Sequence, residues 1–206
     1  DERRFETAMR RVGVAVGRPV VVYDGWAGRA AARAWWLLRF HGHPDVRVLD
    51  GGWDDWRAAG LPVEQGPTVV DEGDFTVARD KGMPIVEAGE VLGVDVLIDA
   101  RAPERFSGEQ EPVDPVDGHI PGARNVPTTL NLCPDGTFRD RSALADTYAA
   151  AGAVPGADVA VYCGSGVTAA HDILALEVSG VRATLYPGSW SGWITDPSRP
   201  VERSAG

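Results

Sequence analysis

A β-branched run, a glycine-rich loop and an apolar helix-like run follow one another at Val159-Ala160-Val161-Tyr162-Cys163-Gly164-Ser165-Gly166-Val167-Thr168-Ala169-Ala170. This order predicts a strand that ends in a loop and feeds a helix N-terminus, where unpaired N–H groups and the positive end of the helix dipole converge. Glycines allow the loop backbone to curl so that its amides point inward at the Cys163 sulfur. Such surroundings favour a thiolate, so we expect Cys163 to be a nucleophile, although a lone cysteine is more often structural.

The composition excludes several classes of function. Of 206 residues 44% are hydrophobic, which is enough for a sizeable core. The formal net charge of −10 argues against nucleic acid and anionic membranes as partners. Only two cysteines are present, with Cys133 in a separate polar segment, and no His or Cys pair has metal-ligand spacing, so we expect neither a disulfide framework nor a metal. No secretory or membrane-length apolar run occurs, which predicts a cytoplasmic protein.

The chain repeats itself at an offset of about 138 residues. The run Val20–Asp24 matches Val159–Cys163, and Gly51-Gly52-Trp53 matches Gly188-Ser189-Trp190. The second copy has early elements with no counterpart in the first. We therefore expect the natural protein to carry roughly 70 to 85 further residues on the N-terminal side.

Within each copy, short β-branched runs alternate with helix-period segments. This alternation predicts an α/β fold, a parallel sheet with helices on both faces. We expect strands at residues 19–23, 46–49, 94–99, 159–162 and 183–185, and helices at 29–40, 53–59, 141–151 and 167–178. Residues 65–82 are polar and Gly-rich, which predicts a linker with one short strand near Phe75 to Ala78.

Several motifs together resemble the tandem rhodanese family of sulfurtransferases. They are Asp99-Ala100-Arg101, Glu104-Arg105-Phe106-Ser107-Gly108, Gly118-His119-Ile120-Pro121-Gly122, the Cys163 to Thr168 loop, and Leu49-Asp50-Gly51-Gly52-Trp53 in the first copy. The resemblance implies two rhodanese-like domains, of which the first is N-terminally truncated. Residues 1–64 are then the C-terminal half of a non-catalytic domain, 65–82 a linker and 83–206 the catalytic domain. Asp24 replaces the cysteine in the first copy, where we expect it to act structurally at the domain interface.

The resemblance also implies a reaction. Cys163 would take a sulfane sulfur from thiosulfate or 3-mercaptopyruvate, hold it as a persulfide and pass it to cyanide or a thiol, without a cofactor. Donor binding would fall to Arg105, at the anionic end of the donor, and to the loop residues Gly164, Ser165, Gly166, Val167 and Thr168.

The identity of the donor stays open at this stage. The Gly164-Ser165 pair resembles 3-mercaptopyruvate enzymes, yet bacterial members with this loop are also described as thiosulfate enzymes. A further Arg that is common in the family is absent, because Val113 and Val116 stand in that stretch. The alternative role for Arg105 is a surface ion pair with Glu104 or Glu109.

Two other functions fit parts of the pattern. A Cys-loop phosphatase needs an Arg six positions after the cysteine to clamp phosphate, but that residue is Ala169. A non-catalytic sulfur-relay or binding module, which receives a persulfide from a protein partner, would keep Cys163 but turn over neither small donor. Turnover therefore distinguishes the relay from the enzyme.

Overall fold

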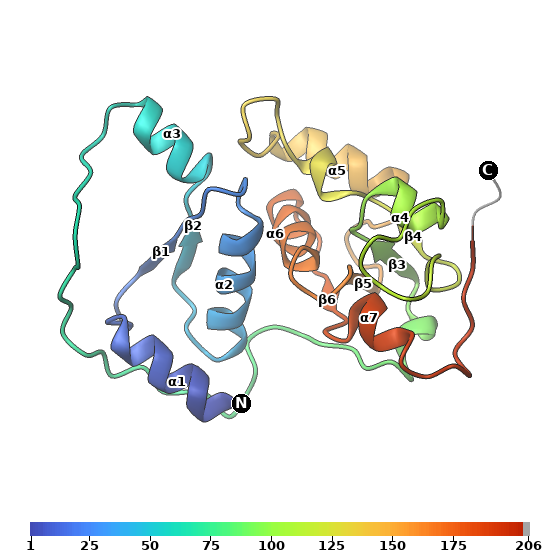
Figure 1. Ribbon diagram of the computed structural model, residues 1–206, viewed down its shortest axis with the longest axis horizontal. Coiled ribbons are helices and arrows are strands. Elements are labelled where there is room, and N and C mark those ends of the chain that lie inside the picture. The colour runs from blue at the N-terminus through green and yellow to red at the C-terminus, as the bar shows by residue number, and fades with distance from the viewer. Residues whose placement is uncertain (204–206) are drawn as a thin grey trace. The chain divides into compact units, whose positions relative to one another are not determined.

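The computed structural model describes residues 1–203 and divides into two compact units. Unit 1 comprises Asp1–Met83, and unit 2 begins at Pro84. Figure 1 shows that each unit has its own parallel strands and helices. No helix within residues 1–203 has the length and apolar character needed to cross a membrane.

Unit 2 is built on a parallel sheet with the strand order β4-β3-β5-β6. The strands are Val96–Asp99 (β3), Arg124–Asn125 (β4), Val159–Tyr162 (β5) and Thr184–Leu185 (β6). Every residue of β3 and β5 is buried, as expected for central strands of β-branched and aliphatic residues. Asp99 pairs with Tyr162, so β3 and β5 end at the same edge of the sheet. Cys163, the next residue, lies at this carboxyl edge, where open α/β sheets bind ligands.

Helices cover both faces of this sheet (Figure 1). On one face α6 (Ala169–Ser179) packs on β5 and β6, and α5 (Arg141–Ala150) packs on α6. On the other face, Trp190 and Trp193 of α7 (Ser189–Trp193) join a core cluster with residues of β3 and β5. The remaining elements are α4 (Pro103–Ser107) and two short 3-10 helices, η1 (Val91–Gly93) and η2 (Thr128–Asn131).

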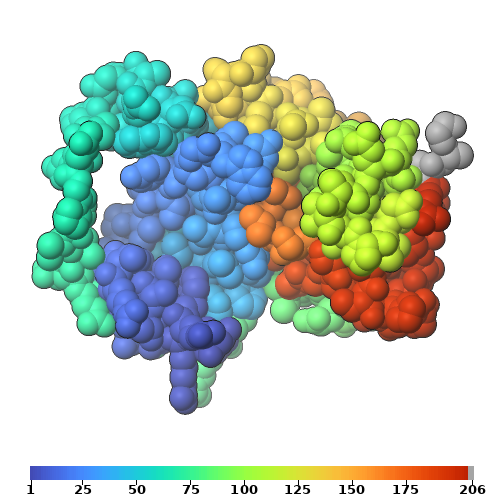
Figure 2. Space-filling model, viewed as in Figure 1, coloured from blue at the N-terminus to red at the C-terminus, as the bar shows by residue number. Residues whose placement is uncertain are grey.

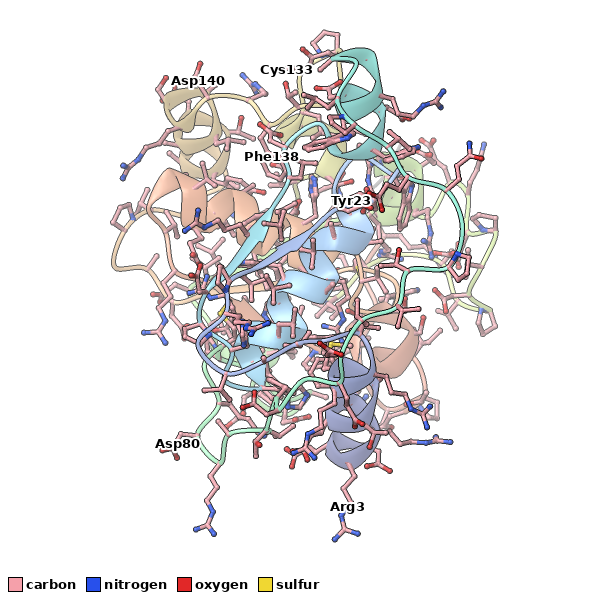
Figure 3. All side chains as sticks on the ribbon, turned by 90° about the vertical axis from the view of Figure 1, so that its left-hand side faces the viewer. Arg3, Tyr23, Asp80, Cys133, Phe138 and Asp140 are labelled. Atoms are coloured by element: carbon pink, nitrogen blue, oxygen red, sulfur yellow. The ribbon has the colours of Figure 1, made fainter. Side chains whose placement is uncertain are left out.

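Unit 1 has two parallel strands, β1 (Val20–Val22) and β2 (Val46–Val48), on which α2 (Arg29–Phe40) packs. Helices α1 (Glu2–Arg11) and α3 (Gly52–Ala58) complete it. Val21 of β1 and Tyr23, which follows this strand, are both 57% exposed. They line a groove of about 520 Å³ together with Trp53, Trp56 and residues of the segment after α3, among them Pro62 and Thr68. Figure 2 shows this segment standing clear of the rest of the unit, and Figure 3 shows Tyr23 on the exposed side.

Nine of the ten strands and helices expected from the sequence are present, with ends within two residues of the expected ones. The expected strand near Phe75 to Ala78 is wrong, because these residues form no strand. Instead the Phe75 N–H donates to the Val14 carbonyl and the Ala78 N–H to the His41 carbonyl, while the Phe75 ring is buried in unit 1. Single bonds to separate elements do not make a ladder.

Candidate active site

The Cys163 side chain lies at the start of the loop between β5 and α6. Its Sγ accepts a hydrogen bond from the Gly166 N–H at 3.1 Å, so one loop amide does point at the sulfur. The Cys163 N–H donates to Ser189 Oγ, also at 3.1 Å. The residue is only 1% exposed, which makes the thiol more enclosed than the sequence suggested. The reason is that the loop folds back over the sulfur rather than standing open.

Gly166 makes this fold-back possible. Its φ of 77° lies in the left-handed region, which residues with a Cβ rarely adopt. A Cβ at this position would also lie 3.0 Å from the Pro187 carbonyl oxygen. Both observations indicate that the Gly166 N–H reaches the sulfur only because this residue is a glycine.

The remaining loop residues offer hydrogen-bond donors that the protein leaves unused. Among residues 1–203, the N–H groups of Gly164, Ser165, Val167 and Thr168 have no acceptor. The hydroxyls of Ser165 and Thr168 make no hydrogen bond there either, and Ser165 is exposed. The loop that follows Cys163 therefore carries a set of free hydrogen-bond donors.

Arg105 lies beside this loop, as the sequence analysis expected. Its Nη1 and Nη2 atoms are 3.5 and 3.6 Å from the place where a Cβ on Gly164 would lie, so the guanidinium group contacts the residue after the cysteine. Its ion-pair partners differ from those considered above. Arg105 pairs with Glu111 at 2.7 Å and with Asp114 at 3.1 Å, and not with Glu104 or Glu109.

A buried charge network continues from Arg105 into the sheet. Arg101 pairs with Asp99 at 2.6 Å and with Glu111 at 3.2 Å, and its guanidinium carbon lies 4.7 Å from the centre of the Trp190 ring. Burial alone would raise the pKa of Glu111, but hydrogen bonds from Arg105 and from two backbone N–H groups outweigh it and lower that pKa. Burial likewise works against the Arg101 charge, yet Asp99 raises the pKa of Arg101 overall. The network thus holds Glu111 and Arg101 in their charged forms.

The sequence analysis missed three residues of this site. Ser189 has a left-handed φ of 51° and accepts the Cys163 N–H. Ser191 donates its Oγ–H to Asp114 at 2.8 Å and its N–H to the Gly164 carbonyl at 2.9 Å. The repeat had singled out the Gly188-Ser189-Trp190 motif without giving it a role, but no sequence signal marked Asp114.

Residues 1–203 contain no group of three or more His, Cys, Asp or Glu side chains placed to hold a metal ion. The other cysteine, Cys133, is partly buried and lies on the loop after η2 that also carries Phe138 (Figure 3).

Comparisons with known proteins agree with this architecture. The rhodanese-like domain family matches residues 4–59 and 85–196. A putative thiosulfate sulfurtransferase, SseB of Mycobacterium tuberculosis, is 47% identical over 97% of this chain and 72% of its own length. A probable 3-mercaptopyruvate sulfurtransferase of Pseudomonas aeruginosa is 45% identical over 98% of this chain and 73% of its own length.

Two solved structures extend the comparison. The 3-mercaptopyruvate sulfurtransferase SseA of Escherichia coli superposes with a TM-score of 0.80 at 36% identity, covering 91% of this chain and 72% of its own. A variant of EanB, solved with ergothioneine covalently linked to a persulfide cysteine, superposes with a TM-score of 0.88 at 25% identity. This chain spans 56% of the EanB chain and is covered completely by it. Since the family matches both units and the curated relatives are so similar, the chain belongs to the tandem rhodanese family of sulfurtransferases.

Proposed function

We propose that this protein moves a sulfane sulfur from thiosulfate or 3-mercaptopyruvate, through a persulfide on Cys163, to cyanide or a thiol acceptor. In this proposal residues 83–206 form the catalytic domain, residues 65–82 a linker and residues 1–64 the C-terminal half of a non-catalytic domain. The protein would work in the cytoplasm, in keeping with its two free cysteines.

One observation carries the proposal, and it comes from the first copy of the repeat. The Asp24 carboxylate, at the position of the cysteine, accepts hydrogen bonds from the Trp26 N–H at 2.8 Å and the Gly28 N–H at 2.9 Å. Burial alone would raise the pKa of Asp24, but these and other backbone N–H groups outweigh it and lower that pKa. The first loop therefore binds a negative charge with its own amides.

The second loop has no carboxylate at the corresponding position. Counted from Cys163, the residues that correspond to Trp26 and Gly28 are Ser165 and Val167. Their N–H groups have no acceptor within residues 1–203. This supports a loop that accepts an anion from outside, either the donor or the charged outer sulfur of a persulfide.

The chemistry follows from this arrangement. The Cys163 thiolate attacks the outer sulfur of thiosulfate, the S–S bond breaks, and sulfite leaves with the bonding electron pair. With 3-mercaptopyruvate the C–S bond breaks instead, and the proton of the donor thiol ends on the methyl carbon of pyruvate. Both routes leave an anionic persulfide on Cys163. Cyanide or a thiolate then attacks its outer sulfur and restores the Cys163 thiolate, so that covalent capture divides one transfer into two steps.

The test is turnover by the full-length protein. We expect cyanide-dependent thiocyanate formation from at least one of the two donors, and donor treatment should add the mass of one sulfur atom. Both signals should vanish in Cys163→Ser and persist in Cys133→Ser, the matched control at the other free cysteine. Absence of turnover with both donors would contradict the proposal, and persulfide transfer from a protein partner alone would favour the relay.

We also propose that preceding residues of the same protein complete unit 1. The support is its exposed apolar side, where Val21 and Tyr23 line the groove, and its two strands against four in unit 2. The mass of the protein isolated from its natural source tests this, since a mass that leaves no room for preceding residues would contradict it.

A further inference from the structure

We infer that Asp114 is a specificity-determining residue of the donor site, because it offsets the charge of Arg105 and so favours donors with one negative charge over dianions. The inference rests on the proposed function and concerns which donor that site accepts. It names a residue that neither the loop motif nor the family resemblance marks.

Most of the Arg105 guanidinium group is already hydrogen-bonded to carboxylates of the protein. Its Nε and Nη2 atoms donate to Glu111 at 2.7 to 3.1 Å, and Nη2 also donates to Asp114 at 3.1 Å. Only Nη1 has no acceptor among residues 1–203. A guanidinium group binds an oxyanion most strongly through two parallel N–H bonds, and Arg105 has committed one side of its fork to carboxylates. A donor therefore meets a cation that is partly neutralised.

The charged side chains around the site do not balance to zero. Three carboxylates, those of Asp99, Glu111 and Asp114, face the guanidinium groups of Arg101 and Arg105, which leaves one excess negative charge. The side chains of Glu111 and Asp114 are only 3% and 8% exposed, so solvent screens them less than surface charges. The second charge of a dianionic donor such as thiosulfate adds repulsion from this excess charge. A donor with a single carboxylate experiences less of it.

Hydrogen bonds through Ser191 tie Asp114 to the reacting loop. Its Oδ1 accepts from Ser191 Oγ at 2.8 Å, and the Ser191 N–H donates to the Gly164 carbonyl at 2.9 Å. Asp114 is therefore fixed between Arg105 and the residue that follows Cys163. Of the two carboxylates on Arg105, it is the better one to vary, because Glu111 also pairs with buried Arg101.

The experiment replaces the charge and keeps the shape. In Asp114→Asn the amide oxygen can still accept from Ser191, while the negative charge is lost. We expect kcat/KM for thiosulfate to rise about fivefold relative to kcat/KM for 3-mercaptopyruvate, mainly through a lower KM, which is the effect of one partly screened unit charge. A merely structural role would change both donors together and leave the ratio unchanged. The matched control is Asp117→Asn, whose carboxylate is 40% exposed and pairs with Arg203 instead. It should leave the ratio as in the wild type.

A second measurement does not require turnover. In a Cys133→Ser background, the rate of Cys163 alkylation is followed by intact mass with iodoacetate, which is anionic, and with iodoacetamide, which is neutral. Asp114→Asn should raise the iodoacetate-to-iodoacetamide rate ratio, and Asp117→Asn should not. Failure of the wild type to turn over either donor would overturn the sulfurtransferase function, whereas the alkylation ratio would still test Asp114. An unchanged alkylation ratio, or an unchanged donor ratio in an active enzyme, would overturn the inference.

Discussion

Ser189 combines a strained backbone with a hydrogen bond from the Cys163 N–H, and the two contributions can be separated. Its φ of 51° is in the left-handed region, it is fully buried, and its Oγ accepts from the Cys163 N–H and donates to the Tyr186 carbonyl. We predict that Ser189→Ala destabilises the protein more than Ser189→Gly does. The larger side chain is therefore expected to give the less stable variant.

The magnitudes follow from the structure. Both variants remove Oγ and leave the buried Cys163 N–H without its acceptor, at a cost of about 1 to 3 kcal/mol. Ala keeps the left-handed strain, which is about 1 to 2 kcal/mol for a residue with a Cβ, whereas Gly relieves it. Part of that gain is offset because glycine has more freedom in the unfolded chain, by about 0.4 to 1 kcal/mol. We expect Ser189→Gly to be more stable than Ser189→Ala by about 1 kcal/mol, or about 2 to 4 °C in Tm.

The assay is thermal unfolding followed by tryptophan fluorescence, since the neighbouring Trp190 is buried. Ser179 provides the control, because it lies in α6 and its Oγ bonds the Leu176 carbonyl. At a helical position the order should reverse, with Ala more stable than Gly by about 1 kcal/mol. If Ser189→Ala proves as stable as Ser189→Gly while Ser179 shows the helical order, the strain argument is refuted.

Two further substitutions test the loops. Asp24→Asn should lower Tm by several degrees at neutral pH, because it loses charge-assisted bonds worth about 1 to 2 kcal/mol, including the one from the Ala31 N–H at 2.7 Å. Folding lowers the pKa of Asp24 from its usual 3.8, so the carboxylate stabilises the protein above that pH and loses this effect as the pH falls through its folded pKa. The difference in Tm between the wild type and Asp24→Asn should therefore narrow below pH 3.8. A difference in Tm that does not change with pH would contradict this prediction. Gly166→Ala should slow Cys163 alkylation or sulfur transfer at least tenfold, and it should destabilise the protein by about 1 to 2 kcal/mol through its left-handed φ. The control is Gly136→Ala, at a similar φ with open space around it, which should destabilise the protein without slowing either reaction. Equal effects on the reaction rates at both glycines would count against a special role for the loop.

The sequence predicted those parts of the fold whose pattern is local. Strand β5 and helix α2 begin and end at the expected residues, because a β-branched run or a helix-period run of that length has one compatible structure. The five-residue helices α4 and α7 are too short for a periodic signal. Tertiary contacts stabilise α7 instead, including the bond from Trp190 Nε1 to the Val116 carbonyl at 3.0 Å. The expected strand around Phe75 was wrong because the backbone hydrogen bonds of this segment go to separate elements of unit 1.

The candidate site likewise has a part that the sequence predicts and a part that it does not. The loop residues from Cys163 to Thr168 are contiguous, so a motif was enough to bring them together. Arg105 was assigned to the donor site through the family resemblance, but its ion-pair partners, Glu111 and Asp114, come from the segment after α4. The contacts of Asp114 with Arg105 and Ser191 join three separate segments. Only the folded chain brings such residues together.

The two copies share one backbone hydrogen bond and differ in the side chains beside it. In unit 1 the Trp53 N–H donates to the Asp24 carbonyl at 2.9 Å, and in unit 2 the Trp190 N–H donates to the Cys163 carbonyl at the same distance. Gly52 and Ser189 precede these tryptophans with φ values of 59° and 51°. A Cβ on Gly52 would lie 2.4 Å from the Asp24 carbonyl oxygen, so unit 1 requires glycine there.

Unit 2 accommodates a Cβ at the corresponding position and uses it to present a hydroxyl to the Cys163 N–H. The exchange of Gly for Ser thus adds a hydrogen bond that fixes the backbone of Cys163.

The exchange of Asp for Cys removes the carboxylate that accepts from the Trp26, Gly28 and Ala31 N–H groups of unit 1. Of the corresponding N–H groups in unit 2, those of Ser165 and Val167 have no acceptor within residues 1–203, whereas that of Ala170 donates to the Val167 carbonyl at 3.2 Å. The loop backbones also differ, since Ala27 and Gly28 have left-handed φ values of 49° and 78° in unit 1, whereas between Cys163 and Thr168 only Gly166 does, at 77°. A loop that holds its own anion and a loop with free donors therefore differ both in these side chains and in the path of the backbone.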